Sequence, residues 1–183
     1  MNNTGIPINT VENLLKDKLK TDLVFSNGTI LGSMCSMPHE LSYTVFTDYL
    51  DRNIGDPGLC PGLQDIESEC ISMLSSLLSG NCAEGSLVTG GTEANILAMW
   101  TMKELFPQKN KVILPETAHF SFDKAARMLG LELVKIAVDD QYRVIADHVE
   151  KAIDENTAGI VGIAGTTGLG TVDPIRKLSE IAE

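Results

Sequence analysis

The sequence predicts an α/β fold in which a mostly parallel sheet carries helices on both faces. From Gly85 onward, short apolar segments alternate with segments of helical period, and this alternation is typical of βαβ units. Loops rich in glycine, threonine or other polar residues follow three of the apolar segments, where sheets of this kind bind their ligands. A helical N-terminal part precedes this region.

Three helices are predicted before Gly85. Apolar residues at helical spacing mark residues 10–20, with Asn9 or Thr10 as the capping residue, and we expect this helix to pack on a partner. A second helix is marked by the apolar residues between 41 and 50. A third, strongly apolar helix covers Ile66 to Leu78, should end at Gly80 and is expected to be buried.

The segment "RNIGDPGLCPG" separates the second helix from the third, because its glycines and prolines oppose regular structure. We therefore predict a helical N-terminal segment over residues 1–55 and an α/β region over residues 56–183.

Strands and helices alternate in the second region. The predicted strands are 85–91, 111–116, 131–138 and 157–165, and the predicted helices are 92–106, 121–129, 146–155 and 173–183. Gly130 should end one of these helices. Asp173 should cap the last helix, with Pro174 at its first position.

Composition and charge exclude several classes of function. The chain has 183 residues, of which 43% are hydrophobic, and carries a net charge of −11 from 14 basic and 25 acidic residues. Nucleic acid is therefore not an expected partner. No run approaches the roughly 18 apolar residues that a membrane span needs, and the N-terminus lacks the pattern of a signal peptide. We expect a cytoplasmic protein with no membrane partner.

Cysteine and histidine residues are scattered along the chain. No CxxC pair occurs among the cysteines, and no histidine stands at a recognised metal-ligand spacing. We expect reduced thiols and no metal site. The four cysteines are Cys35, Cys60, Cys70 and Cys82.

The segment "SLVTGGTEANILAM" joins a predicted strand to a predicted helix. Gly90 and Gly91 would let backbone N–H groups face an anion at the start of the helix, and Thr92 would add a hydroxyl donor. Phosphate is the expected ligand. A second interpretation stays open at this point: the glycines make a tight turn, Thr89 or Thr92 caps the helix, and Glu93 is a favourable acid in its first turn.

Two further loops carry polar groups at the same predicted edge of the sheet. His119 follows the second predicted strand, and Ser121 can cap the next helix. A lone histidine is often only a structural hydrogen-bonding group. Thr166 and Thr167 follow the fourth predicted strand within "GTTGLGTVDP", where three glycines keep the backbone open. Hydroxyls at such a position bond to backbone or to a ligand.

Five segments in order carry a family resemblance. "ILGSMCSMPHE", "NIGDPGLCPG", "VTGGTEANILAM", "AHFSFDKAARMLG" and "GIAGTTGLGTVDPI" resemble successive segments of the group II pyridoxal-phosphate-dependent amino acid decarboxylases, and among them the archaeal L-tyrosine/L-aspartate decarboxylases. The resemblance extends from about residue 25 to residue 183. It implies a large domain of PLP fold type I, the aspartate aminotransferase-like fold, with 56–183 as its first half and an incomplete sheet.

The resemblance also assigns roles to single residues. Gly90, Gly91 and Thr92 match the loop that holds the phosphate of pyridoxal 5'-phosphate (PLP). His119 matches the catalytic histidine that stacks on the pyridine ring, and Thr167 matches a hydroxyl residue beside the cofactor.

The same resemblance also covers the N-terminal segment. Pro38 and His39 match a stretch that helps to shape the substrate pocket.

The implied activity is decarboxylation of an L-amino acid, converting tyrosine to tyramine or aspartate to β-alanine, with glutamate as a further substrate. PLP acts as the electron sink in such reactions. The resemblance further implies a Schiff-base lysine and an aspartate that pairs with the ring nitrogen. The sequence has no matching His-Lys dipeptide and no HxDA stretch, so we expect a truncated decarboxylase that forms a homodimer or needs a companion C-terminal half.

Two alternatives stay open. One is a catalytically inactive PLP- or phosphate-binding fragment that acts as the partner subunit of an intact decarboxylase. The other is an unrelated phosphate-binding α/β domain.

Overall fold

The computed structural model describes residues 5–30, 32–33, 35–55, 58–78 and 84–183. The chain divides into two compact units, Met1–Asn53 and Ile54–Glu183. Gly80 and Cys82, which the sequence analysis singled out, lie outside the described residues. Within the described residues, no helix combines the length and the apolar composition that crossing a membrane requires.

The first unit contains short helices. These are α1 (Ile8–Leu19), a 3-10 turn (Phe25–Asn27) and α2 (Glu40–Asp48). Both α-helices were predicted, but the expected cap of α1 was wrong. Asn9 and Thr10 lie inside the helix, which begins one residue after Pro7, and the Asn9 side chain accepts only from the neighbouring N–H of Thr10. Pro7 is the N-cap residue, and its carbonyl accepts from Thr10 N–H and Val11 N–H at 3.0 and 3.1 Å.

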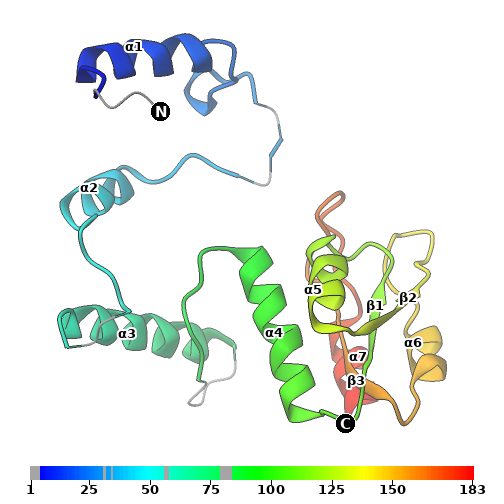
Figure 1. Ribbon diagram of the computed structural model, residues 1–183. Coiled ribbons are helices and arrows are strands. Elements are labelled where there is room, and N and C mark those ends of the chain that lie inside the picture. The colour runs from blue at the N-terminus through cyan, green and yellow to red at the C-terminus, as the bar shows by residue number, and fades with distance from the viewer. Residues whose placement is uncertain (1–4, 31, 34, 56–57, 79–83) are drawn as a thin grey trace. The chain divides into compact units, whose positions relative to one another are not determined.

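The second unit contains a three-stranded parallel sheet (Figure 1) in the order β2-β1-β3. Its elements are α3 (Pro61–Leu78), α4 (Gly91–Leu105), β1 (Lys111–Pro115), α5 (Ser121–Leu129), β2 (Glu132–Ile136), α6 (Ala146–Ala152), β3 (Thr157–Ile160) and α7 (Ile175–Ala182). These bounds confirm three of the four predicted strands and all the predicted helices of this unit. Gly130 ends α5 in the left-handed conformation, with φ 68°.

Helices cover both faces of the sheet, as predicted. Side chains alternate along a strand, and in β1 the alternate residues Val112 and Leu114 pack with buried residues of α4 and α5 in one cluster. Ile113, between them, packs with buried residues of α6 and α7 in the other cluster. β1 is therefore the buried central strand.

The strand predicted at residues 85–91 does not form. Two carboxylates take backbone N–H groups that a strand would offer to a neighbour: Leu87 N–H donates to Glu67 Oε1 at 2.7 Å, and Thr89 N–H donates to Glu93 Oε2 at 2.7 Å. No strand among the described residues pairs with this segment. A strand needs such a partner to satisfy its backbone groups, so an apolar sequence alone does not make one here.

The expectation that the third helix is buried was also wrong. Ser75 is the buried residue of α3 in the described part of the chain, whereas Leu77 and Leu78 are 80% and 87% exposed. No other described helix or strand packs along α3. Apolar periodicity establishes a helix, but burial requires a neighbouring surface.

The start of α7 differs from the expectation in a way that matters for the site. Pro174 is the N-cap residue, and the Asp173 side chain makes no capping hydrogen bond. Asp173 is only 3% exposed, and its carboxylate accepts from Val144 N–H and Ile163 N–H at 2.8 Å each. The carboxylate therefore joins two loops instead of capping the helix.

Candidate active site

The first part of the candidate site is the N-terminal end of α4. Gly90 is the N-cap residue and Gly91 begins the helix. The first N–H groups of a helix have no partner within it. A Cβ atom added to Gly90 or Gly91 would meet nothing within 4 Å, so the space over these backbone groups is open and accessible to an anion.

Glu93 is folded back beside this opening. Its carboxylate accepts from the Thr89 hydroxyl at 2.6 Å and from Thr89 N–H. These two hydrogen bonds hold the pKa of Glu93 below its ordinary value, and the bond from the hydroxyl has the larger effect. The side chain is therefore ionised at neutral pH. Thr89 donates its hydroxyl and does not cap the helix, so the capping part of the second interpretation was wrong, whereas Glu93 does lie in the first turn of α4. Thr92, the other capping candidate, lies inside α4.

The second part is the loop between β1 and α5. His119 is half-buried there, with its ring 4.1 Å from the Phe120 ring between centroids. Its Nδ1 atom accepts from Ser121 N–H at 3.2 Å and lies 2.9 Å from Ser121 Oγ. Phe120 is the N-cap residue of α5, so the expected cap by Ser121 was wrong: its hydroxyl faces the histidine and Asn95 instead.

Asn95 connects the two parts. Its Nδ2 atom donates to Ser121 Oγ at 2.8 Å, and α4 and α5 pack against each other. Figure 1 shows α4 beginning at the end of the sheet where β1 leads into the loop of His119. The structure thus brings the Gly90–Thr92 segment and His119 to one edge, as predicted.

The loop that contains His119 also holds an unpaired polar atom. Thr117 Oγ1 is buried and has no hydrogen-bond partner among the described residues. Buried hydroxyls are normally paired. Thr117 is therefore a polar group of this loop whose hydrogen bonding the described residues do not supply.

The third part is the loop after β3. Thr167 is exposed and lies in a turn of this loop. Thr166 is 5% exposed, and its Oγ1 atom lies 2.7 Å from Thr171 Oγ1. Of the two hydroxyls considered from the sequence, Thr166 is therefore used within the loop and Thr167 is the one that faces solvent.

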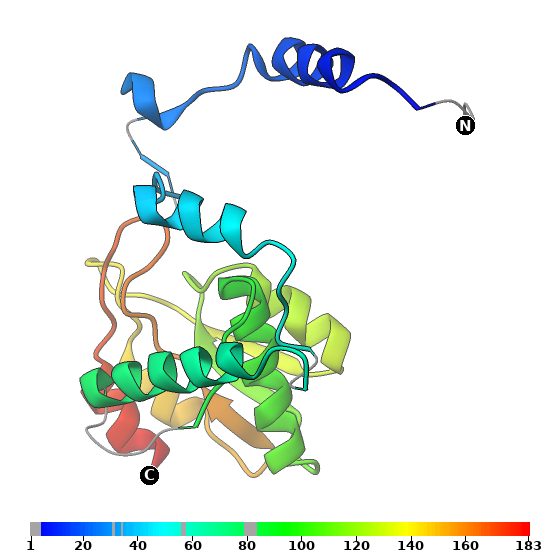
Figure 2. The same ribbon diagram turned by 90° about the vertical axis from the view of Figure 1, so that its left-hand side faces the viewer.

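Asp173 links this loop to the loop after β2, and the sequence analysis missed that role. Besides the two Asp173 bonds, the Thr171 hydroxyl donates to the Tyr142 carbonyl at 3.2 Å. Figure 2 shows the two loops side by side, the one after β3 in orange and the one after β2 in yellow. The signal in the sequence was an aspartate directly before a proline, which also suits a helix cap.

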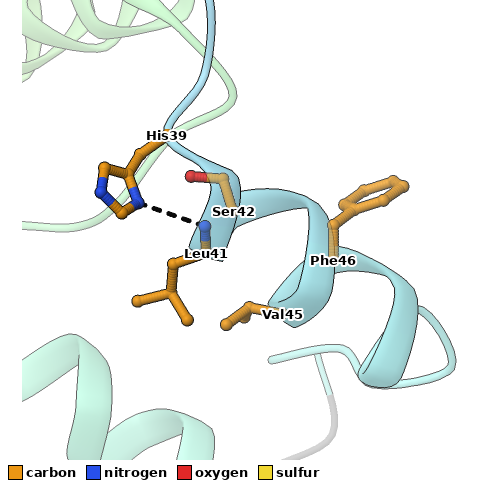
Figure 3. Close-up of a pocket in the computed structure, with 5 residues that line it drawn as sticks. All are labelled: His39, Leu41, Ser42, Val45 and Phe46. Carbon is orange, nitrogen blue, oxygen red and sulfur yellow. Dashed lines mark hydrogen bonds between the residues drawn. The ribbon is translucent and has the colours of Figure 1, made fainter.

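Pro38 and His39 belong to the first unit, whereas the other predicted site residues belong to the second. Both are exposed. His39 is the N-cap residue of α2, and its Nδ1 atom accepts from Leu41 N–H at 3.1 Å (Figure 3). His39 also lines a shallow, mainly apolar hollow on α2, together with Leu41, Ser42, Val45 and Phe46. Its role in a substrate pocket stays a prediction.

Metal-ligating side chains do not gather in the part of the chain that the structure describes: no group of three or more His, Cys, Asp or Glu residues occurs there. The described cysteines Cys35, Cys60 and Cys70 are free. The polar groups of the candidate site are backbone N–H groups, hydroxyls, an amide, an imidazole and the carboxylate of Glu93.

Comparison with known proteins decides the family. The pyridoxal-dependent decarboxylase conserved domain matches residues 34–183. The chain belongs to the pyridoxal-dependent decarboxylase family. This confirms the resemblance inferred from the five segments.

Individual relatives agree with this assignment. The chain is 55% identical over 179 residues to a probable L-aspartate decarboxylase of Pyrococcus abyssi, covering 97% of this chain and 47% of the relative. It is 48% identical over 160 residues to a probable L-tyrosine/L-aspartate decarboxylase of Methanothermobacter thermautotrophicus, covering 87% and 44%. The chain thus spans about half the length of these relatives.

Solved structures confirm the fold class. The sphingosine-1-phosphate lyase of Burkholderia pseudomallei is similar with a TM-score of 0.85 and 30% identity, over 99% of this chain and 46% of that structure. The chain therefore has the PLP fold type I architecture over the part that it contains.

The residues of the candidate site fit the cofactor of the family. PLP has an anionic phosphate and a flat aromatic ring. The open helix start at Gly90 and Gly91 suits the phosphate, and the half-buried imidazole of His119 offers an aromatic face for the ring. The unpaired Thr117 hydroxyl adds a polar group beside them. The roles of these residues as cofactor contacts stay predictions.

Proposed function

We propose that this protein acts in the PLP-dependent decarboxylation of an L-amino acid, with aspartate or tyrosine as the substrate and glutamate as a further candidate. The observation that carries the proposal is the pairing of an open helix start with His119 through Asn95 and Ser121, within a chain of this family. The substrates are proposed from the relatives, which are named as L-aspartate, L-aspartate/L-glutamate and L-tyrosine/L-aspartate decarboxylases.

Each part of the site has a distinct task in this proposal. The N–H groups of Gly91 and Thr92, with the Thr92 hydroxyl, bind the phosphate at the positive end of α4. His119 supports one face of the cofactor ring and so orients the ring relative to the sheet edge. Thr167 contributes an exposed hydroxyl from the third loop. When bound, the cofactor withdraws electrons from the bond to the departing carboxylate.

The charge of Glu93 shapes the phosphate site. Its carboxylate bonds to Thr89 and is therefore directed back along the chain, away from the helix interior. The bonds to Thr89 keep the Glu93 carboxylate from occupying the N–H groups of the helix start itself. Its negative charge still repels a phosphate bound there, because two anions at one helix start repel each other.

Lysine usage supports a second candidate function, PLP binding without catalysis by this chain alone. The lysines of the second unit with described side-chain bonds are held by other groups: Lys103 by the Leu129 carbonyl, and Lys111, Lys135 and Lys177 by aspartates. Lys124 lies over the Phe120 ring, 5.9 Å from its centroid. We propose that a companion chain supplies the lysine that attaches the cofactor, because a second copy of this chain would carry only the same lysines.

The phosphate role is tested by Gly91→Ala. The structure has room for the added methyl group, which tilts toward the N-terminus of the helix, where the phosphate would lie. Alanine favours a helix by up to about 1 kcal/mol over glycine, so the free energy of unfolding should stay equal or rise. Affinity for PLP, measured from its fluorescence, should fall roughly tenfold, because phosphate hydrogen bonds of about 1.5 kcal/mol or more are disturbed.

Gly62→Ala is the matched control. Gly62 is also near the start of a helix, and a Cβ atom there would likewise meet nothing within 4 Å. This variant should gain the same stability and bind PLP as the parent chain does. If Gly91→Ala binds PLP as tightly as Gly62→Ala, the glycines serve only the turn. If the parent chain itself binds no PLP, the proposed function is wrong for this chain.

A further inference from the structure

We propose that Asn95 and Ser121 are positioning residues that fix the tautomer and the ring orientation of His119. This inference rests on the proposed function only for the role of His119 as the support of the cofactor ring. The hydrogen bonds themselves are properties of the chain. They join α4, which carries the phosphate-binding segment, to a side chain 26 residues further along the sequence.

The direction of each hydrogen bond follows from one backbone group. Ser121 N–H lies 3.2 Å from His119 Nδ1 and is a donor only, so Nδ1 is an acceptor and carries no proton. The Ser121 hydroxyl, 2.9 Å from the same atom, must then donate to it. A hydroxyl that donates its proton accepts through its lone pairs, and Asn95 Nδ2 supplies that donor at 2.8 Å. The proton of the neutral imidazole is therefore on Nε2.

Burial makes this arrangement specific. Ser121 is 0% exposed, so water does not replace either of its side-chain bonds. A proton on Nδ1 would face the Ser121 N–H donor, and the buried Ser121 hydroxyl and N–H would lose Nδ1 as the acceptor of their protons, which is costly. The ring of His119 is thus held in one tautomer and one orientation. The last donor in this chain of hydrogen bonds is Asn95 Nδ2, and it belongs to α4, the helix that also carries the phosphate-binding segment.

Coupling between the two parts of the site is the functional consequence. The phosphate and the aromatic ring of PLP are joined by a short CH₂–O linkage, so the two parts must keep their spacing within a narrow range to bind both. Asn95 supplies this connection across the contact between α4 and α5. Geometry held by such supporting hydrogen bonds is what precise ligand placement requires.

Asn95→Asp is the most direct test because it keeps the shape of the side chain and reverses the hydrogen bond. A carboxylate accepts but does not donate, so the Ser121 hydroxyl would donate to residue 95. His119 would then lose this donor, and a proton on Nδ1 would gain the Ser121 oxygen as acceptor. Asn156→Asp is the control, because Asn156 is exposed and directly precedes β3, at the opposite end of the parallel sheet.

The tautomer is read from long-range 1H–15N correlations of the histidine rings in the full 183-residue chain at about pH 8, above the ordinary histidine range. The chain has three histidines, and His119→Gln identifies the signal. The parent chain and Asn156→Asp should show His119 with the proton on Nε2. Asn95→Asp should shift the signal toward the Nδ1–H or doubly protonated form, and affinity for PLP should fall about threefold to tenfold.

If Asn95→Asp does not fold, Ser121→Ala tests whether these hydrogen bonds fix the tautomer of His119. It removes the hydroxyl and leaves the backbone N–H of residue 121 as the remaining donor to Nδ1, so the preference for the Nε2–H tautomer should weaken and a minor Nδ1–H population should appear in the spectrum. A parent chain with the proton on Nδ1 would overturn the proposal, as would an unchanged tautomer in both variants. The spectra need no bound cofactor, so a chain that shows the expected tautomers but binds no PLP contradicts the proposed function alone.

Discussion

Replacing Asp173 with alanine should destabilise the second unit more than most single substitutions do. The carboxylate is 3% exposed and accepts from two backbone N–H groups, those of Val144 and Ile163, at 2.8 Å each. Hydrogen bonds to charged groups contribute about 1.5–3 kcal/mol each. Two of them predict a loss of about 3–6 kcal/mol in the free energy of unfolding, a large part of the usual total of about 5–15 kcal/mol.

Asp173→Asn should lose roughly half as much, because the amide oxygen can still accept one N–H group while its NH₂ cannot accept the other. Both variants are measured by urea unfolding at pH 7, followed by circular dichroism. The loops after β2 and β3 would lose their shared partner, so affinity for PLP should also fall in variants that remain folded.

Asp139→Ala is the matched control for this substitution. Asp139 also accepts from two backbone N–H groups, those of Gln141 and Arg143 at 2.9 Å each, but its side chain is 30% exposed. Water can replace the lost acceptor there, so the loss should be about 1 kcal/mol or less. Equal losses in Asp173→Ala and Asp139→Ala would refute the reasoning, because burial would then not decide the cost.

Two further predictions concern acid stability and association. The pKa values of Asp147 and Asp154 lie below the ordinary value of 3.8, mainly through hydrogen bonds from Lys177 and Lys111. The stability that these carboxylates contribute is therefore present above that value and is lost as the pH falls through the folded-state pKa. Acid titrations followed by circular dichroism should show a smaller decrease in stability for Asp154→Asn than for the parent chain, and equal curves would contradict this. The apolar residues of α3, among them Met73 and Leu77 at 65% and 80% exposure, predict self-association of the chain. Light scattering over a concentration series should detect it and should show less of it after Leu77→Lys, whereas a monomer at every concentration would be the opposite result.

Local sequence patterns determined most of the secondary structure. α5 begins and ends at the predicted residues, Ser121 and Leu129, because an apolar period precedes Gly130 and glycine adopts the left-handed conformation that ends a helix. The core strand 111–115 is recognisable from its run of apolar residues. Five segments in order were also enough to indicate the family, because each combines glycines and polar residues at spacings that packing alone does not require.

Interactions between distant segments were decided only by the tertiary structure. Residues 85–91 have the composition of a strand, yet no described strand pairs with them and the carboxylates of Glu67 and Glu93 bind their N–H groups. The acceptor role of Asp173 depends on loops that meet only after the sheet forms. The donor that orients Ser121 comes from Asn95, on another helix. A local pattern shows which hydrogen bonds a segment can form within itself, whereas these groups form hydrogen bonds with partners that only the folded chain brings close to them.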